Sequence, residues 1–221
     1  MAKKNETTNQ IGMLSKELKK MMRELFGEVL ENDGVLRSRV NHLGVTDAAA
    51  IVDVMLEGGL REEAPYGVLH FHTTFAENVP EESLADLLIA LNGLNHVVSA
   101  GAFPGFGTFA YYDPLEQIYL SYRMPVNLNQ IEAEYDNIRY YLGCLYEQMD
   151  LFMDFLMFTI VNPGAMTIGD YMEYLDEMSD INNLEERLKI FEDEFENMVK
   201  KAGLNLDDIE ENDEDSDDKN E

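Results

Sequence analysis

The chain has 221 residues, no Trp, one cysteine and a net charge of −28. A surface this acidic repels phosphate backbones and anionic lipid headgroups, which argues against nucleic acid or a membrane as a partner. A single cysteine cannot form an intrachain disulfide, and no stretch of about 20 apolar residues is present to span a bilayer, so we expect a cytoplasmic protein.

The first predicted helix covers roughly residues 10–31, because apolar side chains recur there at helical spacing. Turn residues at 32–34 are expected to end it. The basic side chains between Lys16 and Arg23 decorate the opposite face, and we interpret them as a solvated surface. The apolar stripe of this helix contains Leu18, Met21, Met22 and Leu25.

Three strands are predicted next, over residues 35–41 and over approximately 48–57 and 67–75. The second segment could instead be helical on its alanines, but its β-branched centre and the glycines that follow favour a strand. In the third strand, the alternation of side chains places His70 and His72 on one face.

A second helix is predicted from about Asn78 to Gly101, with Pro80 and acidic residues in its first turn. An aromatic hairpin follows it, with strands at about 106–112 and 117–125. The apolar face of the helix consists of Leu84, Leu87, Leu88, Leu91, Leu94 and Val98.

A long helix then runs to about residue 160 and carries an apolar seam whose steps alternate four and three residues without a gap. A seam this regular buries itself against a sheet or against the same helix of a second chain. Cys144 lies inside this helix, and we expect it to be a buried, non-catalytic thiol. The seam consists of Ile131, Tyr135, Ile138, Leu142, Leu145, Met149, Phe152 and Leu156.

These elements follow the order α-β-β-β-α-β-β-α, and the short turns imply a mostly antiparallel sheet of five strands covered by helices. We therefore predict an α+β sandwich over residues 1–162. Residues 163–203 are interpreted as a helical extension that begins with a capping box at Thr167 and Asp170. Residues 204–221 hold ten acidic and one basic side chain and are predicted to form a disordered acidic tail.

Three short motifs carry a resemblance to a known family. Leu91-Asn92-Gly93-Leu94-Asn95 resembles the Leu-Asn-x-Leu-Asn signature of YbjN-type proteins, which are described as bacterial sensory transduction regulators. The glycine-rich turn at 101–107 and the strand end at 120–125 resemble segments that follow this signature. YbjN-type proteins are similar in turn to the type III secretion chaperones, which share the same element order. The resemblance covers about residues 10–160.

The resemblance implies a homodimer without enzymatic activity that holds an extended segment of another protein against apolar patches. The helical extension has no counterpart in those small chaperones. Within the signature, Asn92 and Asn95 lie one helical turn apart, and we expect them to brace the junction between helix and hairpin by bonding backbone groups.

Our leading hypothesis is thus a dimeric protein-interaction module that binds a partner polypeptide and needs no cofactor. The alternative is a metal-binding protein or enzyme centred on His70 and His72, a spacing that suits a chelating pair but specifies no third ligand. A third possibility is a regulator that acts by charge mimicry. A second seam at 184–198 is a further candidate for self-association. The candidates for partner or dimer contact are Leu18, Met21, Met22, Leu25, Phe106, Phe109, Tyr111, Ile138, Leu142, Leu145 and Met149.

Overall fold

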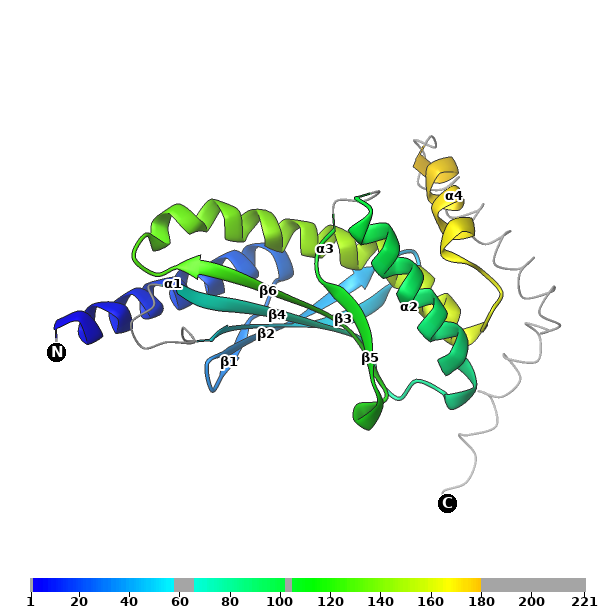
Figure 1. Ribbon diagram of the computed structural model, residues 1–221, viewed down its shortest axis with the longest axis horizontal. Helices are drawn as coiled ribbons and strands as arrows, with labels where there is room; N and C mark the ends of the chain where they lie inside the picture. The colour runs from blue at the N-terminus through cyan, green and yellow to red at the C-terminus, as the bar shows by residue number, and fades with distance from the viewer. Residues whose placement is uncertain (1, 58–65, 102–104, 180–221) are drawn as a thin grey trace, which may run out of the picture.

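The computed structural model describes residues 2–57, 66–101 and 105–179. Within these residues the chain forms an antiparallel sheet of six strands and four α-helices (Figure 1). The helices are α1 (Ala2–Phe26), α2 (Leu84–Ser99), α3 (Ile131–Val161) and α4 (Ile168–Ser179). The strands are β1 (Leu30–Asn32), β2 (Val35–Leu43), β3 (Ala48–Glu57), β4 (Tyr66–Ala76), β5 (Thr108–Tyr112) and β6 (Gln117–Asn127), in the spatial order β1-β2-β3-β4-β6-β5.

The α+β class is confirmed, but the predicted count of five strands is wrong because β1 adds a sixth. β1 pairs with β2 through a two-residue turn at Asp33 and Gly34, where φ is 48° and 80°. Asp-Gly with two positive φ angles is the signal of a tight hairpin, whereas the sequence analysis took it for the end of the first helix. That helix ends earlier, at Gly27, whose φ of 86° breaks the helical geometry.

The first helix also begins earlier than predicted, at Ala2, and the second begins at Leu84 and not near Asn78. The remaining predicted elements are found within a few residues of their expected ends. β3 confirms the strand at 48–57 over the helical alternative. The capping box before α4 is also confirmed, since the Asp170 N–H donates to Thr167 Oγ1 at 3.2 Å and the Thr167 N–H donates to Asp170 Oδ2 at 2.9 Å. The expected helix after residue 183, its 184–198 seam and the acidic tail lie outside the described residues.

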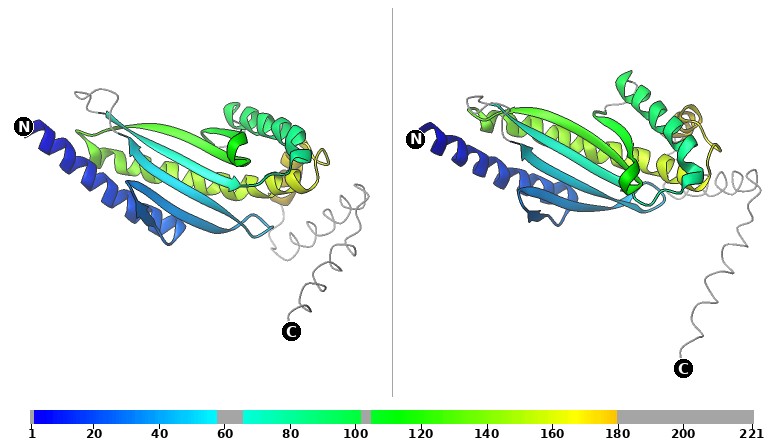
Figure 2. Two further views of the ribbon diagram at one scale, coloured as in Figure 1. Left: turned by 90° about the horizontal axis from the view of Figure 1, so that it is seen from below. Right: turned by 60° about the horizontal axis from the view of Figure 1, so that its bottom comes forward.

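The helices lie on one face of the sheet. α1 and α3 run side by side across it, and α2 flanks the end that β5 forms (Figures 1 and 2). Alternate strand residues such as Val52, Phe71 and Leu120 point to this face and are completely buried. The left view of Figure 2 looks onto the opposite face, which no described helix crosses. The core is therefore a single layer between the helices and one side of the sheet.

The seam of α3 is buried against the sheet of its own chain. Its residues from Ile138 to Leu156 have no exposed surface, and α3 contacts β2, β3, β4 and β6. Complete burial of each such side chain stabilises the fold by about 1.5–3 kcal/mol. Of the two ways to cover the seam, this structure uses the sheet. Within the described part of the chain, no helix is both long and apolar enough to cross a membrane.

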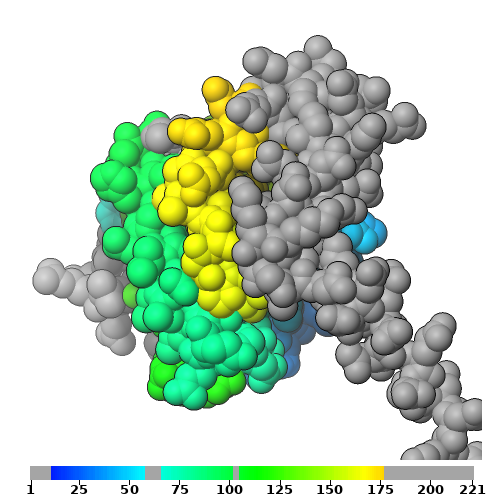
Figure 3. Space-filling view, turned by 90° about the vertical axis from the view of Figure 1, so that its right-hand side faces the viewer, coloured from blue at the N-terminus to red at the C-terminus, as the bar shows by residue number. Residues whose placement is uncertain are grey.

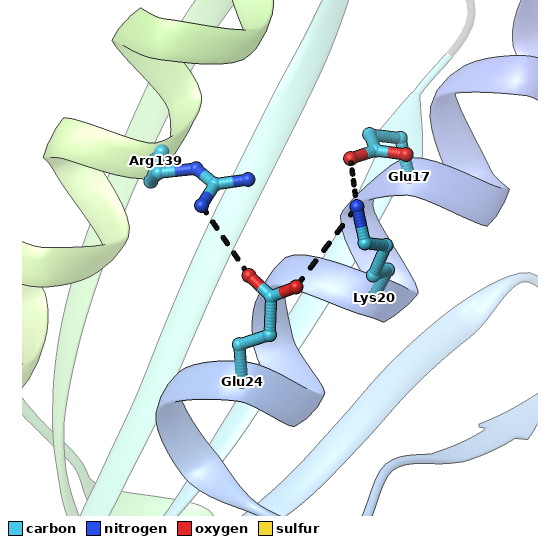
Figure 4. A network of polar contacts seen from close by, with 4 residues as sticks. All are labelled: Glu17, Lys20, Glu24 and Arg139. Carbon is cyan, nitrogen blue, oxygen red and sulfur yellow. Dashed lines mark hydrogen bonds and ion pairs between the residues drawn. The ribbon is translucent and has the colours of Figure 1, made fainter.

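The basic face of α1 is partly paired with acidic side chains. Lys20 Nζ lies 3.2 Å from Glu17 Oε1 and 3.9 Å from Glu24 Oε1. Arg139 of α3 reaches the same Glu24 at 3.3 Å, so one acid joins the two helices at their rim (Figure 4). Exposed pairs of this kind contribute about 0–1 kcal/mol each, so the apolar interface beneath them holds α1 in place.

The turn between β2 and β3 is anchored to α3 by a buried carboxylate. Asp154 accepts hydrogen bonds from the Val45 N–H at 2.8 Å, the Thr46 N–H at 3.0 Å and the Thr46 hydroxyl at 2.7 Å. Gly44 passes so close that a Cβ there would overlap the Asp154 side chain. The Gly44 N–H also donates to Asp150 Oδ1 at 2.9 Å, so two carboxylates of α3 fix this turn.

α4 packs on the main domain of the same chain. The Tyr171 hydroxyl donates to the Leu151 carbonyl of α3 at 2.5 Å, and its ring lies 5.2 Å from that of Phe155. Gly93 of α2 lets Ile168 approach closely, since a Cβ at Gly93 would stand 2.8 Å from the Ile168 side chain. The first part of the predicted helical extension, up to Ser179, thus packs in cis.

Candidate functional site

The bare face of the sheet is polar, and two of its arginines are paired with carboxylates of the same face. Arg37 on β2 donates from Nε and Nη2 to the two carboxylate oxygens of Asp53 on β3, at 2.7 and 2.6 Å. This bidentate pair leaves Asp53 only 7% exposed although it lies on the side away from the core. Arg123 on β6 pairs with Glu57 through a single contact, from Nη2 to Oε2. The charges on this face therefore largely neutralise each other.

His70 and His72 lie on this face, as predicted, but each is engaged by the sheet itself. His70 Nε2 is 2.9 Å from the Ser121 hydroxyl, and the His72 ring stacks on Tyr119 with centroids 4.8 Å apart. Burial lowers the pKa of both imidazoles, and His70 lowers that of His72 further. Burial therefore favours the neutral form of both rings.

The structure does not assemble a metal centre around the two histidines. Their ring centroids are 6.2 Å apart at an interplanar angle of 76°. Among the described residues, no group of three or more His, Cys, Asp or Glu side chains is placed to hold a metal ion. An open depression of about 240 Å³ occurs where β3 begins and β4 ends. Its lining residues include Arg39, Ile51 and Glu77 but neither histidine.

Asn95 on α2 closes the outer edge of β5. Its Nδ2 donates to the Phe109 carbonyl at 2.9 Å, and the Phe109 N–H donates to its Oδ1 at 2.7 Å. One side-chain amide thus takes the place that a neighbouring strand would take beside this residue. The expectation that Asn95 braces the helix–hairpin junction is confirmed, whereas Asn92 is exposed.

The opposite edge of the sheet is also poorly suited to a partner strand. β1 is three residues long, and β2 bulges between Val40 and Leu43, with His42 at a φ of 60°. Short edge strands and bulges hinder strand addition. Neither edge offers a long straight strand, so a partner is better accommodated on a face or on a helix surface.

Most residues that the sequence nominated for partner contact lie in this chain's own core. On α1, Leu18, Met21 and Met22 are buried and Leu25 is exposed. On α3, Ile138, Leu142, Leu145 and Met149 are completely buried. In the hairpin, Phe109 is buried with its ring 5.9 Å from that of Phe152, while Phe106 and Tyr111 are half-buried. Cys144 is buried, as expected. A partner could reach the buried residues only if the helices moved.

Large apolar side chains are exposed instead on α2 and at the neighbouring tip of the β5–β6 hairpin. Leu88 and Ile89 of α2 are 49% and 71% exposed, and Tyr112 and Leu115 at the tip are 47% and 58% exposed. We call these four residues the α2 ridge. The Val79 N–H donates to the Glu116 carbonyl at 3.1 Å, which ties the tip to the segment that leads into α2.

The α2 ridge was not predicted from the sequence, for two reasons. Leu88 was assigned to the buried stripe of the helix, and Ile89 was left outside it. The sequence does indicate that this helix has more apolar surface than one face can bury. The run from Leu87 to Leu91 is apolar at every position, so some of these side chains must lie outside the buried stripe. Tyr112 and Leu115 flank a turn, where no periodicity distinguishes exposed from buried residues.

The fold and these surfaces define the class of protein as α+β, with a one-sided antiparallel sheet and an exposed apolar ridge beside its β5 edge. Comparisons with protein-family models, with curated proteins and with solved structures found no match for this chain.

Proposed function

We propose that this protein is a non-enzymatic polypeptide-binding module of the secretion-chaperone-like type, as its YbjN-like motifs suggest, and that the α2 ridge contacts the partner. The single observation that carries the proposal is the exposure of Leu88, Ile89, Tyr112 and Leu115 at one end of the sheet. Grouped apolar side chains on the surface of a soluble protein mark interaction sites. The paired charges and protected edges of the sheet favour the ridge over the bare face.

The size of the ridge limits what it achieves alone. Each of the four side chains is about half exposed, so its complete burial would contribute about 1 kcal/mol, or about 4 kcal/mol together. Association costs at least about 4 kcal/mol in lost translational and rotational freedom. The apolar contacts therefore orient a partner, and a stable complex needs further polar or charged contacts around them.

Homodimerisation stays a prediction. Since the α3 seam is covered by the sheet of the same chain, a dimer would need another surface. Sedimentation at micromolar concentration measures this directly, and a strict monomer would leave the polypeptide-binding proposal intact while ending the dimer.

The proposal is tested by isolating the full chain from its native cell, identifying any polypeptide that accompanies it in stoichiometric amount, and rebuilding the complex from the two purified chains. We expect the two purified chains to form a complex directly, with a dissociation constant in the micromolar range or below. The proposed function would be refuted if no polypeptide that accompanies the chain in stoichiometric amount forms a complex with it after both are purified.

A further inference from the structure

Among the residues that the structure describes, the elements that form the α2 ridge carry no Lys or Arg. Residues 66–122 hold six acidic side chains and residues 140–179 hold seven, and neither range has a Lys or Arg. These ranges include α2, β5, the hairpin tip, α4 and the second half of α3. The described Lys and Arg side chains lie on α1, β2, β6 and the first half of α3. The described elements of the ridge therefore carry carboxylates and no Lys or Arg.

Acidic residues border the ridge on both of its elements. Glu81 and Glu82 lie on the short 3-10 turn at Glu81–Ser83 that leads into α2, and Asp86 lies in the first turn of α2. At the tip, Asp113 and Glu116 stand beside Leu115, and together with burial they raise the pKa of Tyr111. Figure 3 looks onto this end of the molecule, where α2 (teal to green) and the tip (bright green, at the lower edge) adjoin.

The orientation of α2 joins its exposed residues to the tip. Leu88 lies seven residues before Asn95, so both share one side of the helix, and Asn95 bonds β5. Leu88 therefore lies on the side toward the hairpin, and the more exposed Ile89 points outward from it. Leu88 and the tip are thus placed on the same side of α2, and both elements carry carboxylates as well as exposed apolar side chains.

We infer that the α2 ridge binds a basic amphipathic polypeptide segment, in which Lys or Arg side chains flank an apolar face. This inference rests on the proposed function and names the partner class of the same site. The apolar face of the segment covers Leu88, Ile89, Tyr112 and Leu115. Its cations pair with carboxylates of the tip, of the turn that leads into α2 and of the first turn of α2. No cation of α2 or of the tip competes for those carboxylates.

Other occupants fit less well. A second copy placed ridge to ridge would bring like carboxylates together, which opposes association. Residues 180–221 of this chain hold 17 acidic and five basic side chains, so their net charge has the wrong sign. An anionic membrane surface is repelled for the same reason.

The test uses the intact chain and labelled synthetic peptides of about 18 residues, or five helical turns. One peptide has a Leu face and a Lys face, a second replaces Lys with Glu, and a third replaces Leu with Gln. Fluorescence anisotropy measures their dissociation constants. We expect the Leu/Lys peptide to bind at least tenfold more tightly than either of the others, and its binding to weaken when salt rises from about 0.01 M to about 1 M.

A protein of charge −28 attracts any cationic peptide weakly and without specificity. Matched variants are therefore needed to locate the binding site. Leu88→Gln/Ile89→Gln should weaken Leu/Lys binding about tenfold or more, whereas Met13→Gln/Leu30→Gln, at exposed apolar residues elsewhere, should not. Glu81→Gln/Glu82→Gln should weaken it several-fold and reduce its salt dependence. Glu132→Gln/Asp136→Asn removes the same charge from α3 and should have little effect. Circular dichroism confirms that each variant is folded.

Equal losses in the ridge variants and their controls, or equal binding of the Leu/Glu peptide, would overturn the inference. So would self-association of the chain that disappears in Leu88→Gln/Ile89→Gln, since the occupant would then be a second copy. A native partner that binds this variant at full affinity would refute the ridge as its site and leave polypeptide binding itself standing. Loss of that partner's binding in the same variant would support both.

Discussion

Replacing Asn95 with Leu tests whether a single side chain protects the β5 edge. The substitution removes both hydrogen bonds to the Phe109 backbone, at 2.9 and 2.7 Å, and leaves a donor and an acceptor without a partner on a half-buried edge. Each lost bond costs about 0.5–1.5 kcal/mol, so we expect the free energy of unfolding to fall by about 2 kcal/mol. With a urea m-value of about 2 kcal/mol/M, the unfolding midpoint should drop by about 1 M.

The matched control is Asn92→Leu, three residues away in the same helix and motif. Asn92 is exposed, and Leu is a better helix former than Asn, so this variant should stay within about 0.5 kcal/mol of the parent chain. Asn95→Asp should fall between the two, because it keeps an acceptor for the Phe109 N–H and loses the donor. Urea unfolding followed by circular dichroism measures all three.

Asn95→Leu should also expose the β5 edge to strand pairing, which sedimentation would detect as association that grows with protein concentration. The reasoning fails if Asn95→Leu unfolds at the same urea concentration as Asn92→Leu. A midpoint that falls as expected, without any self-association, would confine the role of Asn95 to stability.

Three further predictions concern the turn at Asp154 and the bare sheet face. Asp154→Ala should lower the free energy of unfolding by about 2–4 kcal/mol, because it removes three hydrogen bonds to the turn; a thermal midpoint within a degree of the parent would contradict this. Gly44→Ala should be destabilising at the same turn, since its Cβ would overlap the Asp154 carboxylate and its φ is 64°; unchanged urea unfolding would show that the turn can relax. Burial lowers the pKa of His70 and His72 below the ordinary 6.5, so the unfolded chain binds protons more readily than the folded one; the stability these neutral rings contribute is complete above about pH 6.5 and is lost as pH falls through their folded pKa values. NMR titration of the two imidazoles should give midpoints below pH 6.5. In the His70→Gln/His72→Gln variant, the free energy of unfolding should fall less steeply as the pH is lowered. An unchanged slope would show that other groups cause the loss of stability in acid.

Periodicity made the main elements predictable from sequence. The unbroken seam from Ile131 to Leu156 specified a long helix with one covered face, and alternation specified the strands around His70 and Leu120. Periodicity shows that a stripe is covered but does not show what covers it. This is why Leu142 and Leu145, buried against the sheet of their own chain, were equally good candidates for a dimer.

Features without periodicity were missed. β1 is three residues long and wholly exposed, so no alternation identifies it, and its Asp-Gly turn was the one local signal. The role of Asn95 could be anticipated as bracing, but its particular bonds to Phe109 depend on how α2 lies beside β5. The ridge at Leu88 and Ile89 required knowing which part of a broadly apolar helix the sheet leaves uncovered.

Hydrogen–deuterium exchange of the full chain, with and without a saturating polypeptide partner, tests most directly where the protein binds. We predict slower exchange in α2 and in the hairpin tip at residues 112–116 when the partner is bound. Slower exchange centred on β3 and β4, with α2 unchanged, would contradict binding at the ridge.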